Sequence, residues 1–364
     1  MHDTYTEITL PFASSPELLE QYTNAYGGLR TGMLMEHLDS LAGSIAYKHV
    51  LGPEVETLGK IQERGFYFVT ASHIAFQRLD MLAPLLPVRD VRLSGQVIYT
   101  GSSSMEVAVK MEAMNTDQEP ETVMLGRFSM VCRDARTQRA RKINSLVIST
   151  PEERSLFNMG EAAKNRRREN LAQSLERVPP NKIEAADLHA YELKYGQEEA
   201  DKEKLWMGDT RLEKTMLMFP QERNVHSKVF GGYLMRLAYE LGFSNASLFT
   251  RSHVTFLSLD RISFARPVPI GCILRLTSQI IYSTPPEAGK GAVHVAVQAY
   301  VVDVSTGKEE MTNDFRFTWR RDDGKPASRR VVPRTYKEAM LWLEGKRALE
   351  LGAKIRGRRD QNLA

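Results

Sequence analysis

Cysteine is scarce in this sequence. Only Cys132 and Cys272 occur among 364 residues, each inside an apolar run typical of a strand. Two cysteines allow one disulfide at most, and neither lies at a spacing used by metal sites. We therefore expect a chain that folds without a disulfide framework, a metal ion or any other cofactor, in a reducing compartment.

Long hydrophobic runs are missing as well. Hydrophobic residues make up 42% of the chain and charged residues 26%, and no window approaches the roughly 18 unbroken apolar residues of a membrane span. The segment from Met1 to Phe12 has neither the apolar core of a secretory signal nor the Arg/Ser-rich pattern of a transit peptide. We expect no membrane span, and we expect any targeting sequence to have been removed.

A strong charge of one sign and several common catalytic motifs are also absent. The formal net charge is only +4, although basic residues gather around 164–168 and 354–359. Solvated helix faces explain such patches, and a small polyanionic ligand would need only a few of these charges, so we expect no nucleic-acid partner. No Gly-x-Ser-x-Gly elbow occurs and no Gly-Gly pair is followed by Gly-Lys-Ser/Thr, which disfavours a serine hydrolase and a P-loop.

An internal repeat is present. The length favours two domains, and the segment RLSGQVIYTG at 92–101 is matched by RLTSQIIYST at 275–284, each followed shortly by a VAV strand pattern. Upstream, Gly32-Met33-Leu34-Met35 matches Gly232-Tyr233-Leu234-Met235 at a spacing of 200, as Asn24 matches Asn224. Repeats fix the architecture, so we expect two similar domains.

Each half is predicted to have a helix and then strands. After each glycine comes a helical stretch of about 18 residues that is apolar on most of its circumference, which indicates a largely buried helix. Alternating patterns predict four antiparallel strands after it. A curled antiparallel sheet around a central helix is an α+β unit known as a hotdog domain. The predicted strands are Phe66 to His73, Asp90 to Thr100, Met105 to Ala113 and Val123 to Arg133, then Ser258 to Ala265, Cys272 to Ser283, Ala292 to Asp303 and Thr312 to Arg320.

The predicted domain organisation has four parts. Residues 1–150 form the N-terminal hotdog domain and 205–325 the C-terminal one. Residues 151–204 are rich in charge and are broken by Pro179-Pro180, which predicts a linker of helix, turn and helix. Residues 326–364 form a tail that contains a helix from Tyr336 to Ile355.

Asp39 is the strongest candidate for chemistry. It lies between Leu38 and Leu41 in the apolar helix of the first half, where an acid is unfavourable unless it has a partner. One interpretation is an acid that only accepts hydrogen bonds at a domain interface. The other is a carboxylate that activates water or attacks a carbonyl. Tyr239 stands at the corresponding place in the second half.

Three further positions accompany Asp39. Gly231 and Gly232 begin the second-half helix without side chains, so their amides are suited to a developing oxyanion. Asn224 precedes them in a loop and could orient a water molecule, although turn formation is the usual role of a lone loop Asn. His226 is a possible site residue, and a loop-capping role explains it equally well.

The strings that carry these residues resemble a known family. PQERNVHSKVFGGYLM at 220–235 resembles the second-domain signature of double-hotdog acyl-CoA thioesterases of the mitochondrial branch, and NAYGGLRTGMLMEHLDSLAGSIA at 24–46 resembles their first-domain signature. The resemblance implies an acyl-CoA substrate, with an Asn before one helix and an Asp within the other as the working pair. On this chain those positions are Asn224 and Asp39.

The resemblance also implies a mechanism, an assembly and a location. Amides at Gly231 and Gly232 would polarise the thioester carbonyl, and Asp39 would be the base for a water held by Asn224. A second pairing of Asn24 with Tyr239 would be silent, because tyrosine is a poor base near neutral pH. The family forms trimers of the double unit, and its mitochondrial branch places the protein in the matrix, with the cytoplasm as the alternative.

Two other functions remain open from the residues alone. A hotdog dehydratase or hydratase would need a catalytic His paired with an acid, for which His226 is the nearby candidate. A non-enzymatic acyl-CoA sensor or scaffold is favoured if Asp39 is only an interface acid.

Overall fold

The computed structural model describes residues 1–52, 65–70, 78–115, 119–137, 139–196, 203–224, 226–285, 287 and 289–362. Contacts between residues divide the chain into two compact units. The first unit contains Met1–Arg168, Leu217–Leu237 and Ile262–Cys272, and the second contains Glu169–Met216, Ala238–Arg261 and Ile273–Ala364. Parts of both sequence halves therefore belong to the first unit.

The first unit contains an antiparallel sheet in the order β1-β4-β5-β6-β3, with β2 also paired to β6. β4 and β5 join through a tight hairpin, and β5 and β6 run side by side over most of their length. The strands are β1 (Thr6–Leu10), β2 (Phe66–Thr70), β3 (Arg78–Met81), β4 (Val91–Thr100), β5 (Ser104–Ala113) and β6 (Glu121–Asp134).

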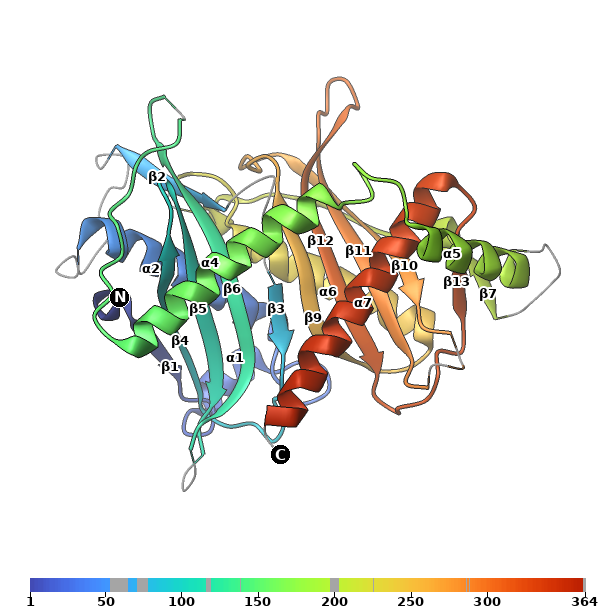
Figure 1. The fold of residues 1–364 in the computed structure, drawn as a ribbon, viewed down its shortest axis with the longest axis horizontal. Coiled ribbons are helices and arrows are strands. Elements are labelled where there is room, and N and C mark those ends of the chain that lie inside the picture. Colours follow the sequence, from blue (N-terminus) through green and yellow to red (C-terminus); the bar gives the residue numbers. More distant parts are fainter. Residues whose placement is uncertain are drawn as a thin grey trace. The chain divides into compact units, whose positions relative to one another are not determined.

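Helix α2 (Thr31–Leu51) is the central helix of the first unit and packs on β4 and β5 (Figure 1). Its apolar side chains are buried, and Leu34, Met35, Leu38 and Ile45 have no exposed surface. Burial of one such side chain contributes about 1.5–3 kcal/mol. The close approach is possible because β4 has a glycine beneath the helix: a Cβ on Gly95 would lie 2.9 Å from the Ile45 side chain. The predicted buried helix is confirmed.

Helix α4 (Pro151–Ala172) covers the opposite face of this sheet (Figure 1). Gly160 lies directly on β4, since a Cβ there would be 2.6 Å from the Tyr99 Cβ. Further along, the Arg167 guanidinium donates two hydrogen bonds to the Glu106 carboxylate, which is also held by Ser129 at 3.1 Å. A buried pair of this kind destabilises the fold strongly when one partner is removed, so α4 is firmly attached to the sheet.

The second unit repeats this construction. Its strands follow the order β9-β12-β11-β10-β8, and the pairs β10–β11 and β11–β12 are antiparallel. The strands are β8 (Leu212–Leu217), β9 (Val254–Phe264), β10 (Ile273–Ser283), β11 (Ala292–Val302) and β12 (Glu309–Arg321), with a small parallel pair of β7 (Lys204–Trp206) and β13 (Arg330–Val332).

Helix α6 (Gly231–Thr250) and helix α7 (Tyr336–Asn362) correspond to α2 and α4. Tyr239 of α6 packs among Phe256, Phe317 and Trp319, with ring centroids 4.9–6.2 Å apart. On the other face, α7 packs on β10 and β11 and on α5 (Lys182–Tyr195), whose Tyr191 ring contacts Trp342 at 4.6 Å. The remaining short elements are η1 (His2–Thr4), α1 (Pro16–Tyr22), η2 (Met207–Thr210) and η3 (Pro220–Glu222).

Small irregularities recur in both halves. β4 has a register shift between Val97 and Tyr99, and β10 has one between Ile280 and Tyr282. At each bulge a threonine hydroxyl accepts the strand amide: Thr4 from Val97 at 3.1 Å and Thr210 from Ile280 at 3.0 Å. Bulges re-aim the residues that follow them, and here each one turns a tyrosine, Tyr99 or Tyr282, toward the outer helix.

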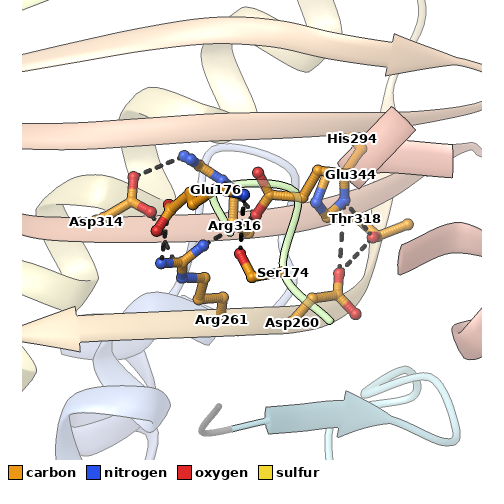
Figure 2. Close-up of polar contacts among 9 residues, drawn as sticks. All are labelled: Ser174, Glu176, Asp260, Arg261, His294, Asp314, Arg316, Thr318 and Glu344. Carbon is orange, nitrogen blue, oxygen red and sulfur yellow. Dashed lines mark hydrogen bonds and ion pairs between the residues drawn. The ribbon is translucent and has the colours of Figure 1, made fainter. Parts of the chain in front are cut away.

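The face of the second unit beneath α7 contains a buried polar cluster, drawn in Figure 2. Glu344 of α7 accepts a hydrogen bond from Arg261 at 3.1 Å, and Arg316 pairs with Asp314 at 2.6 Å. Beside them the Thr318 hydroxyl donates to Asp260 at 2.5 Å, and it lies 2.9 Å from His294 Nδ1. A hydroxyl has one proton to give, so His294 donates from Nδ1. Each charge in this cluster has a partner, as buried charges require.

Several sequence predictions can be compared with these elements. The two central helices, the helices on either side of Pro179-Pro180 and the helix from Tyr336 are present, and α7 extends beyond the predicted Ile355. The predicted order of helix and then strands was incomplete, because β1 and β8 precede the helices. Both are short strands with mostly exposed side chains, which weakens their alternation.

Other boundaries differ in detail. β9 begins at Val254 rather than Ser258, and β3 was not predicted. Residues 71–73 of the strand predicted from Phe66 to His73 lie outside the described residues, as do parts of the predicted linker. The four predicted domain ranges remain a prediction. No helix in the described part of the chain is long and apolar enough to cross a membrane.

Candidate functional site

Asp39 lies in the middle of α2 and faces the first turn of α6, within the first unit. The backbone amide of Gly232 donates a hydrogen bond to its carboxylate. Oδ2 of Asp39 lies 3.3 Å from the place that a Cβ on Gly231 would occupy, beside the Phe264 ring. The acid found in the first half and the glycine pair found in the second half are therefore in contact.

The environment of Asp39 changes its acidity. Burial raises the pKa of Asp39 to about 7; the Gly232 hydrogen bond opposes this rise and the nearby Glu36 carboxylate adds to it. The residue as a whole nevertheless keeps part of its surface exposed. A carboxyl group that is desolvated but reachable, with a pKa near the working pH, is suited to general base catalysis.

The close approach of α6 to α2 leaves no room for a side chain at Gly232. A Cβ on Gly232 would lie 3.0 Å from both the Cα and the carbonyl oxygen of Glu36, which are backbone atoms that cannot turn aside. Glu36 and Arg236, which are also separated by 200 residues, form an ion pair at 3.0 Å. Glycine thus lets α6 begin against α2, and the ion pair holds the two helices at this point.

Asn224 shapes the loop that leads into α6. Its side-chain Oδ1 accepts hydrogen bonds from the His226 amide at 2.8 Å and from the Lys228 amide at 3.1 Å. Its backbone amide donates to the Lys228 carbonyl at 2.6 Å. The turn-forming role considered from the sequence is therefore present in the structure.

Asn24 forms the same turn in the first half, with one difference. Its Oδ1 accepts from the amides of Tyr26 at 2.9 Å and Gly28 at 3.1 Å, and its Nδ2 donates to the Leu29 carbonyl at 3.2 Å. Nδ2 of Asn224 has no acceptor in the part of the chain that the structure describes. The second-half amide can therefore donate to another molecule while its oxygen holds the turn.

His226 contacts α2. Its Nε2 lies 3.1 Å from the hydroxyl of Tyr47, and burial lowers the pKa of the imidazole. Tyr47 was not found from the sequence, because a tyrosine late in an apolar helix looks like ordinary packing. Phe264 was also missed, since it reaches Gly231 only through the tertiary fold.

No group of three or more metal-binding side chains occurs among the described residues. Tyr239, the second-half counterpart of Asp39, lies in the aromatic cluster of the second unit. The two halves have thus taken different residues at this position, one polar and one aromatic.

Comparison with known proteins gives three results. No model of a known protein family matches the chain. The chain is 32% identical over 357 residues to the mitochondrial acyl-coenzyme A thioesterase 9 of Bos taurus, covering 95% of this chain and 77% of that protein. It is 30% identical over 352 residues to the chloroplastic acyl-coenzyme A thioesterase 2 of Humulus lupulus, covering 93% of this chain and 78% of the relative.

Solved structures share the fold at much lower identity. An acyl-ACP thioesterase from Bacteroides thetaiotaomicron aligns with a TM-score of 0.50 at 8% identity, covering 87% of this chain and 98% of that one. A Lactobacillus plantarum protein assigned as an oleoyl thioesterase aligns with the same TM-score at 13% identity, covering 87% and 95%. The chain is thus an α+β protein of two tandem hotdog domains.

The relatives make the family more specific than the fold does. The chain belongs to the acyl-CoA thioesterase family, in the group that contains the mitochondrial thioesterase 9.

Proposed function

We propose that this chain hydrolyses fatty acyl-CoA to free fatty acid and CoA, with Asp39 as the general base. Its relatives are acyl-CoA thioesterases along almost its whole length. The observation that carries the assignment of Asp39 is its position: a desolvated carboxyl with a pKa of about 7, fixed by the Gly232 amide at the start of α6.

The proposed reaction begins with a water molecule beside Asp39. The ionised carboxylate takes one proton from the water while the oxygen attacks the thioester carbonyl carbon. The tetrahedral oxyanion that forms then collapses, the carbon–sulfur bond breaks, and the proton on Asp39 passes to the departing CoA thiolate. General base catalysis of this kind contributes about 10²–10⁴-fold.

Two donors are available for the oxyanion and the water. Gly231 lies against the carboxylate at the N-terminus of α6, where amides favour negative charge. Nδ2 of Asn224 is the second donor, and it suits a water or a carbonyl oxygen. Gly232 receives a different role from the one expected, because its amide already donates to Asp39. In this proposal it aims the base rather than binding the oxyanion.

The proposed site is composite, since Asp39 comes from the first sequence half and Asn224 from the second. The chain would then have one working site, with no counterpart built on Asn24 and Tyr239. Accumulation of an acyl–Asp39 anhydride during turnover would overturn the general base role in favour of direct attack.

The location and assembly are part of the same proposal. Several relatives are named as mitochondrial thioesterases, which supports a mitochondrial protein, and we place it in the matrix. We also propose a homo-oligomer, a trimer of the double unit. Gel filtration with light scattering tests the assembly, and a monomer at assay concentration would contradict it.

Release of free CoA thiol from acyl-CoAs of short to long chain tests the function. Wild type should turn over, and Asp39→Asn should lose at least about a hundredfold in kcat while it keeps its fold. Ser40→Ala changes the exposed neighbour on the same helix and should keep full activity. Binding without thiol release by the wild type would instead favour an acyl-CoA sensor.

A further inference from the structure

Four exposed basic side chains occupy the loop that follows β6. They are Arg136, Arg139, Arg141 and Lys142, and we call residues 135–142 the basic loop. The acid next to it, Asp134, interacts electrostatically with Arg136. Its Oδ1 is occupied by the amides of Arg136 at 3.1 Å and Thr137 at 2.7 Å, which form the turn.

The backbone of the basic loop is anchored at both ends. The Asp134 amide donates to the Arg139 carbonyl at 2.9 Å, and the Arg141 amide donates to the Cys132 carbonyl at 2.9 Å. Arg133 and Ala140 also pair as an antiparallel bridge. The described residues on either side of position 138 therefore pair beside the end of β6, and their basic side chains are exposed to solvent.

A chain of contacts links the basic loop to the proposed site. The Arg141 guanidinium lies over the Phe66 ring at 4.8 Å, and the Phe66 and Tyr47 rings are 6.1 Å apart. The Tyr47 hydroxyl in turn meets His226, whose amide is bound by Asn224. All of these residues belong to the first unit.

Asp39 and Tyr47 lie on the same helix, well apart along its axis. Tyr47 follows Asp39 by eight residues on α2, which corresponds to about 12 Å along a helix axis. Through Phe66, Arg141 of the basic loop reaches the Tyr47 end of α2 rather than the Asp39 end.

The corresponding loop of the second half has fewer exposed basic side chains. After β12, Arg321 pairs with Asp323 at 2.7 Å and donates to the Thr250 carbonyl at 3.0 Å, while the Thr255 hydroxyl donates to Asp322. Asp323 thus lies beside both Arg321 and Lys325. Arg139, Arg141 and Lys142 have no ion pair among the described residues, and they belong to the half that also contains Asp39.

We propose that the basic loop binds the phosphate groups of CoA, and this rests on the proposed thioesterase function. Acyl-CoA carries its thioester at one end of the pantetheine arm and its phosphates at the other. A thioester placed at Asp39 therefore needs cationic side chains an arm's length away, and the contacts through Phe66 place Arg141 on the Tyr47 side of α2. Arginine suits this role because its guanidinium binds phosphate oxygens bidentately.

Steady-state kinetics with two substrates test the assignment. Arg139→Ala/Arg141→Ala should raise KM for acyl-CoA about tenfold or more and leave kcat within about twofold. The same variant should hydrolyse the matching S-acyl-pantetheine, which has no phosphates, as the wild type does. S-acyl-dephospho-CoA, which lacks the 3′-phosphate, shows whether that group or the diphosphate is bound.

Arg166→Ala/Arg168→Ala is the matched control, since both residues are exposed on α4 and the change in charge is the same. It should leave KM for both substrates unchanged. Arg139→Lys/Arg141→Lys should recover only part of the affinity, because it restores the charge without the bidentate geometry. The wild-type KM should rise with salt more than that of the alanine variant.

The outcomes separate this inference from the function on which it rests. An unchanged KM for acyl-CoA in Arg139→Ala/Arg141→Ala, or an equal rise for S-acyl-pantetheine, would overturn the phosphate site while thiol release by the wild type still stood. Absence of thiol release by the wild type would overturn the function itself.

Discussion

A carboxyl group with a pKa near 7 is half ionised at neutral pH, which sets Asp39 apart from ordinary surface acids. The cause is burial against α6, opposed by the Gly232 amide. Only the ionised form can accept a proton from water. We therefore predict that kcat/KM rises with pH, is half-maximal near pH 7 and is constant above about pH 8. A pH profile corrected for spontaneous thioester hydrolysis checks this, and a flat profile from pH 6 to 8 would refute it.

The same shift predicts an effect on stability. The folded-state pKa of Asp39 lies above the ordinary value for aspartate, so the folded chain holds this proton more tightly than the unfolded chain does. Stability is then lost as the pH rises from about 4 to 7. We expect Asp39→Asn to melt at a higher temperature than the wild type at pH 8 and at a similar temperature at pH 4. Equal melting temperatures at pH 8 would contradict this account.

Asn24 and Asn224 provide a matched pair of substitutions. Both hold a turn through Oδ1, so Asn24→Ala and Asn224→Ala should destabilise the fold by similar amounts, roughly 1 kcal/mol. Of these two residues, only Asn224 has an Nδ2 without an acceptor in the described chain. Thermal unfolding should therefore show two similar variants, whereas thiol release should fall at least about tenfold in Asn224→Ala alone. Comparable losses of activity in both variants would rule out a special role for Asn224.

At the scale of elements, the first turn of α6 is the critical part of the proposed site. Gly232→Ala would place a Cβ 3.0 Å from the Glu36 backbone, so the helix must shift away from α2. We predict that this substitution lowers both stability and kcat. Gly43 lies in α2, and a Cβ added there would have nothing within 4 Å, so Gly43→Ala should leave activity intact and raise stability by up to about 1 kcal/mol. Equal effects of the two substitutions on kcat would contradict the contact.

Some of the helices and strands could be predicted from the sequence, and others could not. Periodicity predicted α2, α6 and α7, because each has a long apolar stripe, and the repeat located the acid and the glycine pair. Strands β1 and β8 were missed because most of their side chains are exposed. Their sequences therefore lack the clear alternation of apolar and polar residues that marks a half-buried strand. The partners of Asp39 depended on tertiary contact: nothing local to Phe264 or Tyr47 indicates that they approach residues far away in the chain.

At the scale of the whole molecule, the two halves have similar folds but different residues at the position of Asp39. Asp39 stands where the second half has Tyr239, and Tyr239 is packed among aromatic rings. We therefore predict one binding site per chain for a non-hydrolysable acyl-CoA thioether, measured by titration calorimetry with the Asp39→Asn variant as a second sample. A stoichiometry of two would show that the position occupied by Tyr239 also serves a site.

The outer helices α4 and α7 determine where the chain could be cut into fragments that keep their sheets covered. Gly160 of α4 rests on Tyr99, and Gly345 of α7 rests on Tyr282, each after the same bulge in the same strand of its half. The structural repeat thus includes an outer helix in each half. Helix α4 covers the first sheet and also connects the two halves of the sequence. A fragment ending at residue 150 would expose Ile98 and leave Glu106 without Arg167. One ending near residue 174 would keep both covered, so limited proteolysis of the native chain should nick the segment after α4 before it cuts within that helix.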